Sequence, residues 1–454
     1  MNKGGFFKMF KSLKRISSTR MIALSFLIVI LSGAILLCLP VSSRTGEWTS
    51  FIDALFTATS ATCVTGLVVF DTYTHWSLFG QLVILTMIQI GGIGLMTIII
   101  MVFIFLKKKI SLHERMILMQ SAGTVRISGM VKLVKRITAG TLFCESIGAL
   151  LLAIRFIPKM NFWQGLYYAI FHSVSAFCNA GFDLMGKYES FSSLTAYETD
   201  PFVNIVIMLL IIIGGIGFLV WDEILHYGIH FKKYSLHAKI VLSTTLFLIA
   251  LGTLGILYLE YDGNLAGLTF PEKLLSSAFM SVTTRTAGFN SMDTASLSEA
   301  GSLFSMILMF IGGSPGSTAG GIKTSTLAVV FFAMISMSRG QKQVTLFRRT
   351  LAVNIVKQAS VIIIIYLTGI LTATILICHL EPYSLTDILF ETISAAATVG
   401  LSRGITPTLC SFSHIILAIL MFGGRIGGLS MMLVFGEEKP QPPIQRPTEP
   451  IIIG

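Results

Sequence analysis

Charged residues are scarce in this sequence. They occupy 12% of the 454 positions, with 22 acidic side chains against 33 basic ones. A soluble protein of this length carries about 25% charged residues, so the deficit excludes an ordinary soluble domain. Hydrophobic residues reach 54%, and the mean hydropathy is +0.81. The composition therefore predicts a membrane protein.

Cysteine is also rare, and its pattern excludes several kinds of site. The six cysteines show neither Cys-x-x-Cys nor metal-ligand spacing, so we interpret most of them as small buried hydrophobes. Paired carboxylates, a metal-spaced histidine cluster and a Ser/His constellation at a common depth are missing too, which argues against an enzyme. Gly316 to Lys323 looks like a phosphate loop, but Ile322 separates its last glycine from the lysine. With no Gly-x-Gly-x-x-Gly pattern elsewhere, we predict that no nucleotide is bound by this chain.

Long uncharged apolar runs are abundant instead. The first, Met21–Pro40, has twenty residues, enough to cross a hydrocarbon core of roughly 30 Å as a helix. It is long for a signal peptide and no Ala-x-Ala-like site follows it, so we expect it to be retained. Seven comparable runs follow, at 79–106, 137–157, 202–220, 238–259, 303–335, 352–380 and 412–435. The sequence thus predicts eight membrane crossings.

The net charge of +11 comes from basic residues that gather in the connections on one side of the membrane. Lysine and arginine gather before residue 21, at 107–136 and at 339–357, connections that the crossings place on one side of the membrane. The connections on the other side are mildly acidic. The positive-inside rule then puts both termini in the cytoplasm of a multi-pass protein of the cell (plasma) membrane. The charge reflects topology and contact with membrane lipids, and no nucleic acid partner is predicted.

A short segment that ends in glycine recurs on the outer side, once between the two crossings of each pair. A phenylalanine precedes the glycine by ten residues in three copies and by nine in the third. These pairs are Phe56 and Gly66, Phe171 and Gly181, Phe279 and Gly288, and Phe390 and Gly400. A segment of ~10–14 residues is too short to span a bilayer and has the length of a re-entrant element. We therefore predict an all-α membrane protein with four pseudo-repeats of helix, re-entrant pore helix and helix, giving eight transmembrane helices and four pore loops around one central pore.

The predicted boundaries follow from these units. In chain order they are a cytoplasmic basic N-terminus at 1–20, pore repeat 1 at 21–106, a cytoplasmic linker at 107–136, pore repeat 2 at 137–220, a linker at 221–237, pore repeat 3 at 238–338, a linker at 339–351, pore repeat 4 at 352–435 and a cytoplasmic tail at 436–454.

The residues that end each re-entrant segment form the predicted cation filter. A dehydrated potassium ion needs several oxygens in place of its water, and rings of backbone carbonyls supply them. Glycine favours such a turn because it reaches positive φ at little cost, and the C-terminus of a short helix adds partial negative charge. The predicted ion-binding residues are Val64, Thr65, Gly66, Asn179, Ala180, Gly181, Thr286, Ala287, Gly288, Thr398, Val399 and Gly400. Their side chains differ between copies, which favours backbone ligation over a carboxylate site.

These features resemble the Trk/Ktr/HKT potassium transporter superfamily, and within it most closely the KtrB-type membrane subunit. The resemblance covers the chain from about Arg20 to Gly454. It is carried by Ser-Ala-Thr-Cys-Val-Thr-Gly66-Leu, Phe-Cys-Asn-Ala-Gly181-Phe, Thr-Arg-Thr-Ala-Gly288-Phe, Ala-Thr-Val-Gly400-Leu and Gly-Gly-Ser-Pro-Gly-Ser-Thr-Ala-Gly-Gly-Ile-Lys323-Thr. The chain departs from the family pattern at Cys63 and Cys178, where small polar residues are usual.

Proline and glycine interrupt the second helix of the third repeat, just below the filter. Residues 312–321 hold five glycines and Pro315 inside an apolar crossing, so the helix should unwind there. The resemblance implies an intramembrane loop that obstructs the pore and moves to open it. An arginine in the last crossing is costly at that depth and is expected to donate hydrogen bonds to carbonyls of this loop. The alternative is a side chain that reaches the cytoplasmic surface or serves packing. The predicted gate residues are Gly312, Gly313, Ser314, Pro315, Gly316, Ser317, Thr318, Gly320, Gly321, Lys323 and Arg425.

Four other polar residues lie near the predicted filter. We expect Arg285 to brace the filter through an acidic neighbour, with Glu391 as a candidate, and His172 and Asp53 to serve packing or capping roles.

The resemblance also implies the ion and the partners. It implies K+ as the transported ion, leaves Na+ open as an activator, and implies a homodimer with a cytosolic RCK-type nucleotide-binding regulatory ring that is KtrA-like. The alternative is an ion-coupled secondary transporter with a broken-helix substrate site, because interrupted crossings mark those folds. Four units that run in the same direction favour the pore.

Overall fold

The computed structural model describes residues 18–94, 97–98, 101, 130–341, 343–427 and 449, and most of these residues are helical. The predicted basic N-terminus up to residue 17, most of the linker 107–136 and the tail 436–454 apart from residue 449 lie outside the described residues.

Each predicted unit begins with a long helix and continues with a short one. The long helices are α2 (Ser18–Cys38), α7 (Met130–Phe156), α11 (Leu236–Leu259) and α15 (Val353–Leu380). The short ones are α3 (Phe51–Cys63), α8 (Phe162–Phe177), α12 (Phe270–Thr283) and α16 (Leu385–Ala397). Among the described residues, four spans are long and apolar enough to cross a membrane, and they fall on these four long helices. The short helices carry the repeated phenylalanines, all of which are buried.

The second helix of every unit ends or bends at a cluster of glycines, at 91–94, 214–217, 312–316 or 423–427, whereas we predicted an interruption in the third unit alone. α4 (Leu78–Ile93) ends before Gly94, and α17 (Ser411–Ile426) ends before Gly427. α9 (Pro201–Ile216) turns by 98° at Gly217 into α10 (Phe218–Tyr227). These three glycines have φ of 89°, 93° and 103°, a conformation that cannot continue a right-handed helix. The spans predicted as continuous are therefore interrupted, and a loop also separates α13 (Glu299–Phe310) from α14 (Thr324–Ser338).

Side-chain caps fix where several of these helices begin. The hydroxyl oxygens of Ser77, Ser235, Ser298 and Ser384 accept backbone N–H groups at the first turns of α4, α11, α13 and α16. Short 3-10 turns lie in the connections, at Pro40–Ser42, Ile157–Lys159, Met185–Lys187, Thr195–Tyr197, Phe231–Lys233 and Thr406–Thr408.

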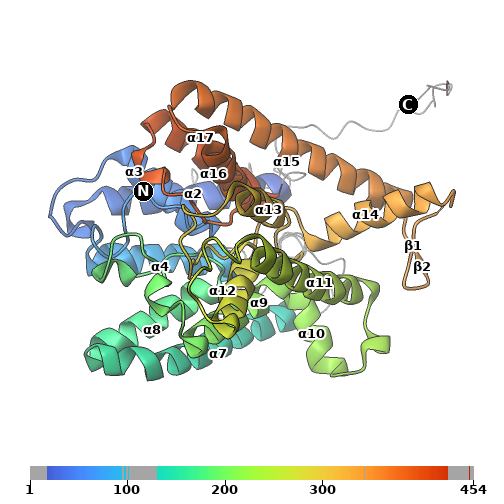
Figure 1. The fold of residues 1–454 in the computed structure, drawn as a ribbon, viewed down its shortest axis with the longest axis horizontal. Helices are drawn as coiled ribbons and strands as arrows, with labels where there is room; N and C mark the ends of the chain where they lie inside the picture. The colour runs from blue at the N-terminus through green and yellow to red at the C-terminus, as the bar shows by residue number, and fades with distance from the viewer. Residues whose placement is uncertain are drawn as a thin grey trace, which may run out of the picture.

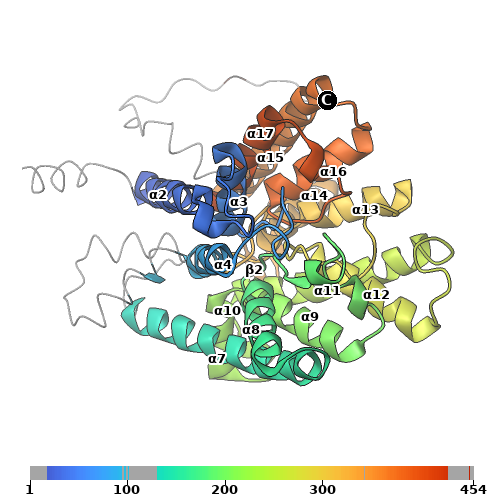
Figure 2. The ribbon, with the colours of Figure 1, turned by 90° about the vertical axis from the view of Figure 1, so that its left-hand side faces the viewer.

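The four units close into a ring. The second helix of each unit packs against the short helix of the next: α4 on α8, α9 on α12, and α13 on α16. α17 of the fourth unit packs on α3 of the first and completes the circle. Figure 2 shows α3, α8, α12 and α16 arranged around the middle of the molecule, where the loops converge. A ring of like units encloses a single axis.

One small hairpin departs from the all-α prediction. β1 (Thr345–Leu346) pairs antiparallel with β2 (Arg349–Thr350) beyond the end of α14, where it projects from the body in Figure 1. Its two turn residues, Phe347 and Arg348, have φ of 48° and 63°. A two-residue turn of this kind matches the twist of the paired strands, and it forms here without the usual glycine.

Candidate functional site

The four predicted filter segments share one backbone pattern. Each short helix is followed by a residue at positive φ, and the glycine two positions later has positive φ as well. The non-glycine residues are Val64 (57°), Asn179 (60°), Thr286 (67°) and Thr398 (53°). The glycines are Gly66 (99°), Gly181 (70°), Gly288 (79°) and Gly400 (93°). All twelve predicted filter residues are buried, so four copies of one irregular backbone turn meet inside the ring.

These segments touch one another in cyclic order. A Cβ added to Gly66 would lie 2.6 Å from the Ala180 carbonyl oxygen, and one on Gly181 would lie 2.8 Å from that of Ala287. A Cβ on Gly288 would lie 2.7 Å from the Val399 carbonyl oxygen. A Cβ on Gly400 would overlap the Thr65 carbonyl oxygen, which returns the circle to the first unit. The middle residue of every segment thus places its carbonyl against the glycine of the neighbouring segment, and no side chain larger than hydrogen fits there.

Hydroxyl groups near the end of each short helix hold the segments in place, a feature that the predicted site did not include. Ser60 and Ser394 accept the N–H of Gly66 and Gly400, each at 3.0 Å. In the other two units the hydroxyl donates instead, from Ser175 to the Phe182 carbonyl at 2.7 Å and from Thr283 to the Phe289 carbonyl at 2.5 Å.

The sequence contains a pattern that could have predicted these hydroxyl groups. A serine lies six residues before the glycine in three units, and a threonine lies five before it in the third unit. The third short segment is one residue shorter, which accounts for the shift.

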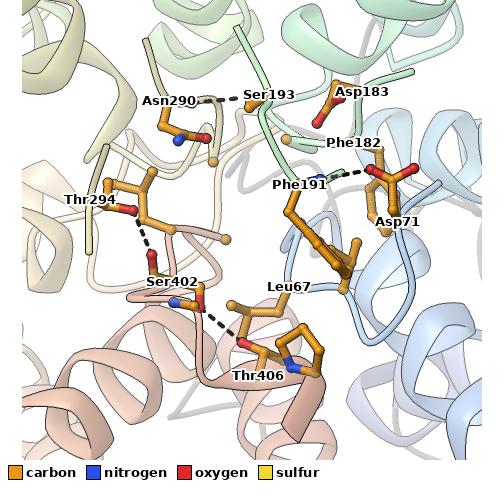
Figure 3. A pocket seen from close by; sticks show the side chains of 18 of the residues that line it. Leu67, Asp71, Phe182, Asp183, Phe191, Ser193, Asn290, Thr294, Ser402 and Thr406 are labelled. Atoms are coloured by element: carbon orange, nitrogen blue, oxygen red, sulfur yellow. Dashed lines mark hydrogen bonds between the residues drawn. The ribbon is translucent and has the colours of Figure 1, made fainter. Parts of the chain in front are cut away.

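A cavity of about 450 Å³ lies directly beside the four filter glycines, on the side where the outer loops meet. Figure 3 shows its wall, to which all four units contribute. Asp71 of the first unit accepts the N–H of Phe191 at 2.9 Å, and Ser193 accepts the N–H of Asn290 at 3.2 Å. The Thr294 hydroxyl donates to the Ser402 carbonyl at 2.5 Å. These bonds tie successive units together around the cavity, which we call the outer vestibule.

The outer vestibule is lined by three carboxyl groups and no basic side chain among the described residues: Asp71, Asp183 and Asp293. The pKa of the half-buried Asp183 carboxyl is raised to about 7, chiefly because burial disfavours its charged form. The negative charge of Asp71 also raises this pKa, while a hydrogen bond from the Met185 N–H lowers it. The outer vestibule therefore carries negative charge that changes near neutral pH.

The loop predicted as a gate is packed against the second unit. The N–H groups of Ser314 and Thr318 donate to the carbonyls of Gly215 and Gly214 at 3.0 Å and 3.2 Å, at the end of α9. The Thr318 hydroxyl contacts the Phe177 carbonyl at 3.2 Å and the Asn179 side-chain oxygen at 3.3 Å. Residues 312–321 thus lie against both the bend in α9–α10 and the second filter segment.

Two cations hold this loop from below the filter. The Arg425 guanidinium donates to the Thr318 carbonyl and, in the first unit, to the carbonyls of Gly91 and Gly92, the last at 3.4 Å. The Lys323 ammonium donates to the Ala319 carbonyl at 2.6 Å. The contact between Arg425 and loop carbonyls that underlies the gating hypothesis is thus present, while the gating role stays a prediction.

The predicted pairing of Arg285 with Glu391 is wrong. Glu391 accepts hydrogen bonds from the Thr406 hydroxyl at 2.8 Å, from the Arg403 N–H at 3.2 Å and from the Ser402 hydroxyl. It therefore braces the chain that follows the fourth filter segment. Arg285 is buried and donates to the Thr245 hydroxyl at 3.3 Å.

The two remaining polar residues have structural partners. His172 Nδ1 donates to the Tyr168 carbonyl at 2.8 Å, and its Nε2 accepts the Leu184 N–H at 3.3 Å. Both ring nitrogens are occupied, which fits the packing role that we predicted. Asp53 lies 3.6 Å from His414.

The ligands available to a cation at the ring are backbone oxygens. Within the described residues no group of three or more His, Cys, Asp or Glu side chains could hold a metal ion. The buried hydroxyls of Thr65, Thr286 and Thr398 have no hydrogen-bond partner in the part of the chain that the structure describes. The ring thus offers carbonyl oxygens, the type of ligand that replaces the hydration shell of the ion in potassium channels.

Comparison with known proteins gives consistent matches. The family model TrkH, described as "Cation transport protein", matches residues 7–446. "Potassium/sodium uptake protein NtpJ" of Enterococcus hirae is 41% identical over 448 residues, which cover 97% of this chain and 98% of that protein. "Ktr system potassium uptake protein B" of Bacillus subtilis is 40% identical, with 97% of each chain covered. The crystal structure of the potassium transporter TrkH from Vibrio parahaemolyticus shares the fold, with a TM-score of 0.72 at 15% identity over 93% of this chain and 86% of that one.

Proposed function

Because the chain belongs to the TrkH family of cation transport proteins, we propose that it takes up potassium ions through the ring of four filter segments. Membership of this family makes it an ion-transport protein of the membrane and not an enzyme. We propose the plasma membrane as its location, with eight crossings, four pore loops and both termini in the cytoplasm.

The cyclic contact of the filter segments is the observation that carries this proposal. Carbonyl oxygens from Thr65, Ala180, Ala287 and Val399 each lie against the glycine of the preceding unit in the ring. Four such oxygens around one axis can replace part of the hydration shell of an ion, as carbonyl rings do in potassium channels. The acidic outer vestibule would raise the local cation concentration at the entrance.

The loop at 312–321 is our proposed gate. It lies beside the second filter segment and is held by Arg425, which reaches it from the fourth unit while also binding the first. A change in any of these contacts would let the loop move away from the second filter segment. We propose that a homodimer is the functional unit and that a cytosolic RCK-type ring, whose subunits bind the nucleotide, biases the loop.

A second candidate is an ion-coupled secondary transporter. The interruption of the second helix in all four units favours it, because broken helices form the substrate sites of many transporters. Strict coupling with saturation at low ion concentration would support this mechanism, and large unitary currents would support the channel-like one.

The proposal is tested by uptake of K+ and Na+ into proteoliposomes, with wild type compared with Gly288→Ser. Gly288 has φ of 79° and no room for a Cβ, so a serine must displace the Val399 carbonyl. We expect wild type to prefer K+ and the variant to lose uptake or admit Na+. Unchanged uptake of both ions by a correctly folded variant would mean that the glycines serve helix packing alone.

A further inference from the structure

A buried carboxylate lies behind the second filter segment and has no role in the proposed function. Glu145, on α7, is 6% exposed, and none of the ion pairs among the described residues includes it. Its partner is the Gln89 amide of α4, whose Nε2 donates to both carboxylate oxygens at 3.0 Å and 3.1 Å. An ionisable side chain inside a membrane-spanning helix is costly, so it is retained where it serves function.

This pair holds the end of the second short helix. The Cys178 thiol, directly after α8, lies 3.6 Å from Gln89 Oε1 and 3.9 Å from Glu145 Oε1, within range of weak S–H hydrogen bonds. Gly92, on the same helix as Gln89, leaves room for the sulfur, because a Cβ there would lie 2.6 Å from it. Helix α4 of the first unit and helix α7 of the second unit thus enclose the thiol that follows α8.

The residue after Cys178 is Asn179, which begins the second filter segment. Its side-chain amide lies 3.5 Å from the Arg285 carbonyl, just before the third filter segment, and its oxygen accepts from the Thr318 hydroxyl in the gate loop. A shift of Cys178 therefore moves a residue that contacts both a neighbouring filter segment and the loop.

We propose that Glu145 is a positioning residue that sets the preference of the pore for K+ over Na+, by fixing Cys178 and hence Asn179 through Gln89. The inference rests on the proposed function, since it takes the second filter segment as part of the ion pathway. In the cavity-size account of ion selectivity, a filter held at one width cannot contract around the smaller sodium ion. Loosening one of its four walls removes that restriction and admits sodium.

The test is the ratio of K+ to Na+ uptake in proteoliposomes for Glu145→Gln. A glutamine at 145 offers one oxygen where the carboxylate offers two, and it turns an N–H group toward the Gln89 amide or the thiol. We expect the ratio to fall about tenfold, in line with the loss of one charge-assisted buried hydrogen bond. The double variant Gln89→Glu with Glu145→Gln keeps one carboxylate and one amide, and it should recover most of the ratio.

A matched control is Thr253→Val, a buried side chain on α11 whose hydroxyl donates to Ile249 of its own helix. This variant should keep the wild-type ratio. Equal loss of K+ and Na+ uptake in Glu145→Gln would indicate a merely structural role and would overturn the inference. An unchanged ratio would also overturn it.

Two further comparisons keep the result interpretable. If Glu145→Gln does not fold, two variants of Cys178 replace it. Cys178→Ser should keep the ratio of K+ to Na+ uptake and Cys178→Ala should lower it, because only serine retains a hydrogen-bond donor. Equal ratios in these two variants would overturn the inference. Gly288→Ser is measured in parallel. If it changes selectivity while Glu145→Gln does not, the inference alone fails. If Gly288→Ser has no effect, the proposed filter itself fails.

Discussion

At the scale of single residues, backbone conformation distinguishes the candidate site more than side-chain chemistry does. Val64 and Thr398 are β-branched, yet both adopt positive φ two positions before a filter glycine. Such residues cost about 1–3 kcal/mol each and persist only where the surrounding structure fixes them. The sequence could predict the glycines, because glycine is the residue that positive φ favours. It could not predict the left-handed residues, because their local preference opposes the observed conformation.

The charge of the outer vestibule leads to a prediction on pH. Because the pKa of Asp183 is raised to about 7, this carboxyl is neutral at an external pH of 6 and negative at pH 8. Acidification should raise the KM for K+ uptake by about twofold to fivefold with little change in the maximal rate, since long-range attraction of cations in an acidic cavity is lost. Uptake at varied external pH measures this.

Asp183→Asn is the matched variant for that measurement. It should show the high KM at both pH values, because the titrating charge is gone. A variant that keeps the full pH dependence of wild type would assign the effect to another group.

At the scale of elements, the sequence was sufficient to predict the four short helices and the interruption in the second helix of the third unit. Their semi-apolar composition, their length and their terminal glycine recur four times. The breaks in the other three second helices escaped prediction because their glycines also serve close packing. A Cβ on Gly91, Gly214 or Gly424 would overlap a carbonyl oxygen at the end of a short helix. A glycine cluster that permits close packing does not by itself indicate that the helix ends one to three residues later.

The contacts of the gate loop give a prediction for Arg425→Ala. Removal of the guanidinium frees the carbonyls of Thr318 and Gly91 and loosens the loop from the first and fourth units. We expect K+ uptake in the absence of any regulatory partner to rise about tenfold, the factor that the loss of one charge-assisted hydrogen bond represents. Proteoliposome uptake at equal protein incorporation measures this.

Arg155→Ala serves as the control for that variant. Arg155 lies 3.6 Å from Asp200 in a partly exposed ion pair remote from the loop, so its loss should leave basal uptake unchanged. Equal uptake by wild type and Arg425→Ala would contradict a gating role for this arginine.

At the scale of the whole molecule, closure of the ring depends on contacts that no local pattern contains. The packing of α17 on α3 joins units separated by the entire chain. The four repeats made a ring a reasonable prediction, since each unit starts and ends on the same side. The pairing of each second helix with the next short helix follows from tertiary packing and became visible only in the structure.

Orientation in the membrane is a further testable property. Cys410 is exposed. It lies in the chain between Thr408, which lines the outer vestibule, and the start of α17, on the side that we assign to the exterior. In intact cells, a membrane-impermeant maleimide should label wild type and fail to label Cys410→Ser. A cysteine introduced as Lys232→Cys in the Cys410→Ser background should react only after permeabilisation. Labelling of Cys410 only in permeabilised cells would reverse the proposed topology.

The most direct test of the account is to locate the ion itself. Crystals grown with Rb+, a heavier analogue of K+, would reveal bound ions by their anomalous scattering. We predict a peak on the axis of the ring, within coordination distance of the carbonyl oxygens of Thr65, Ala180, Ala287 and Val399. Ordered filter segments with no peak between them, and a peak elsewhere in the protein, would contradict the claim that these four segments form the ion pathway.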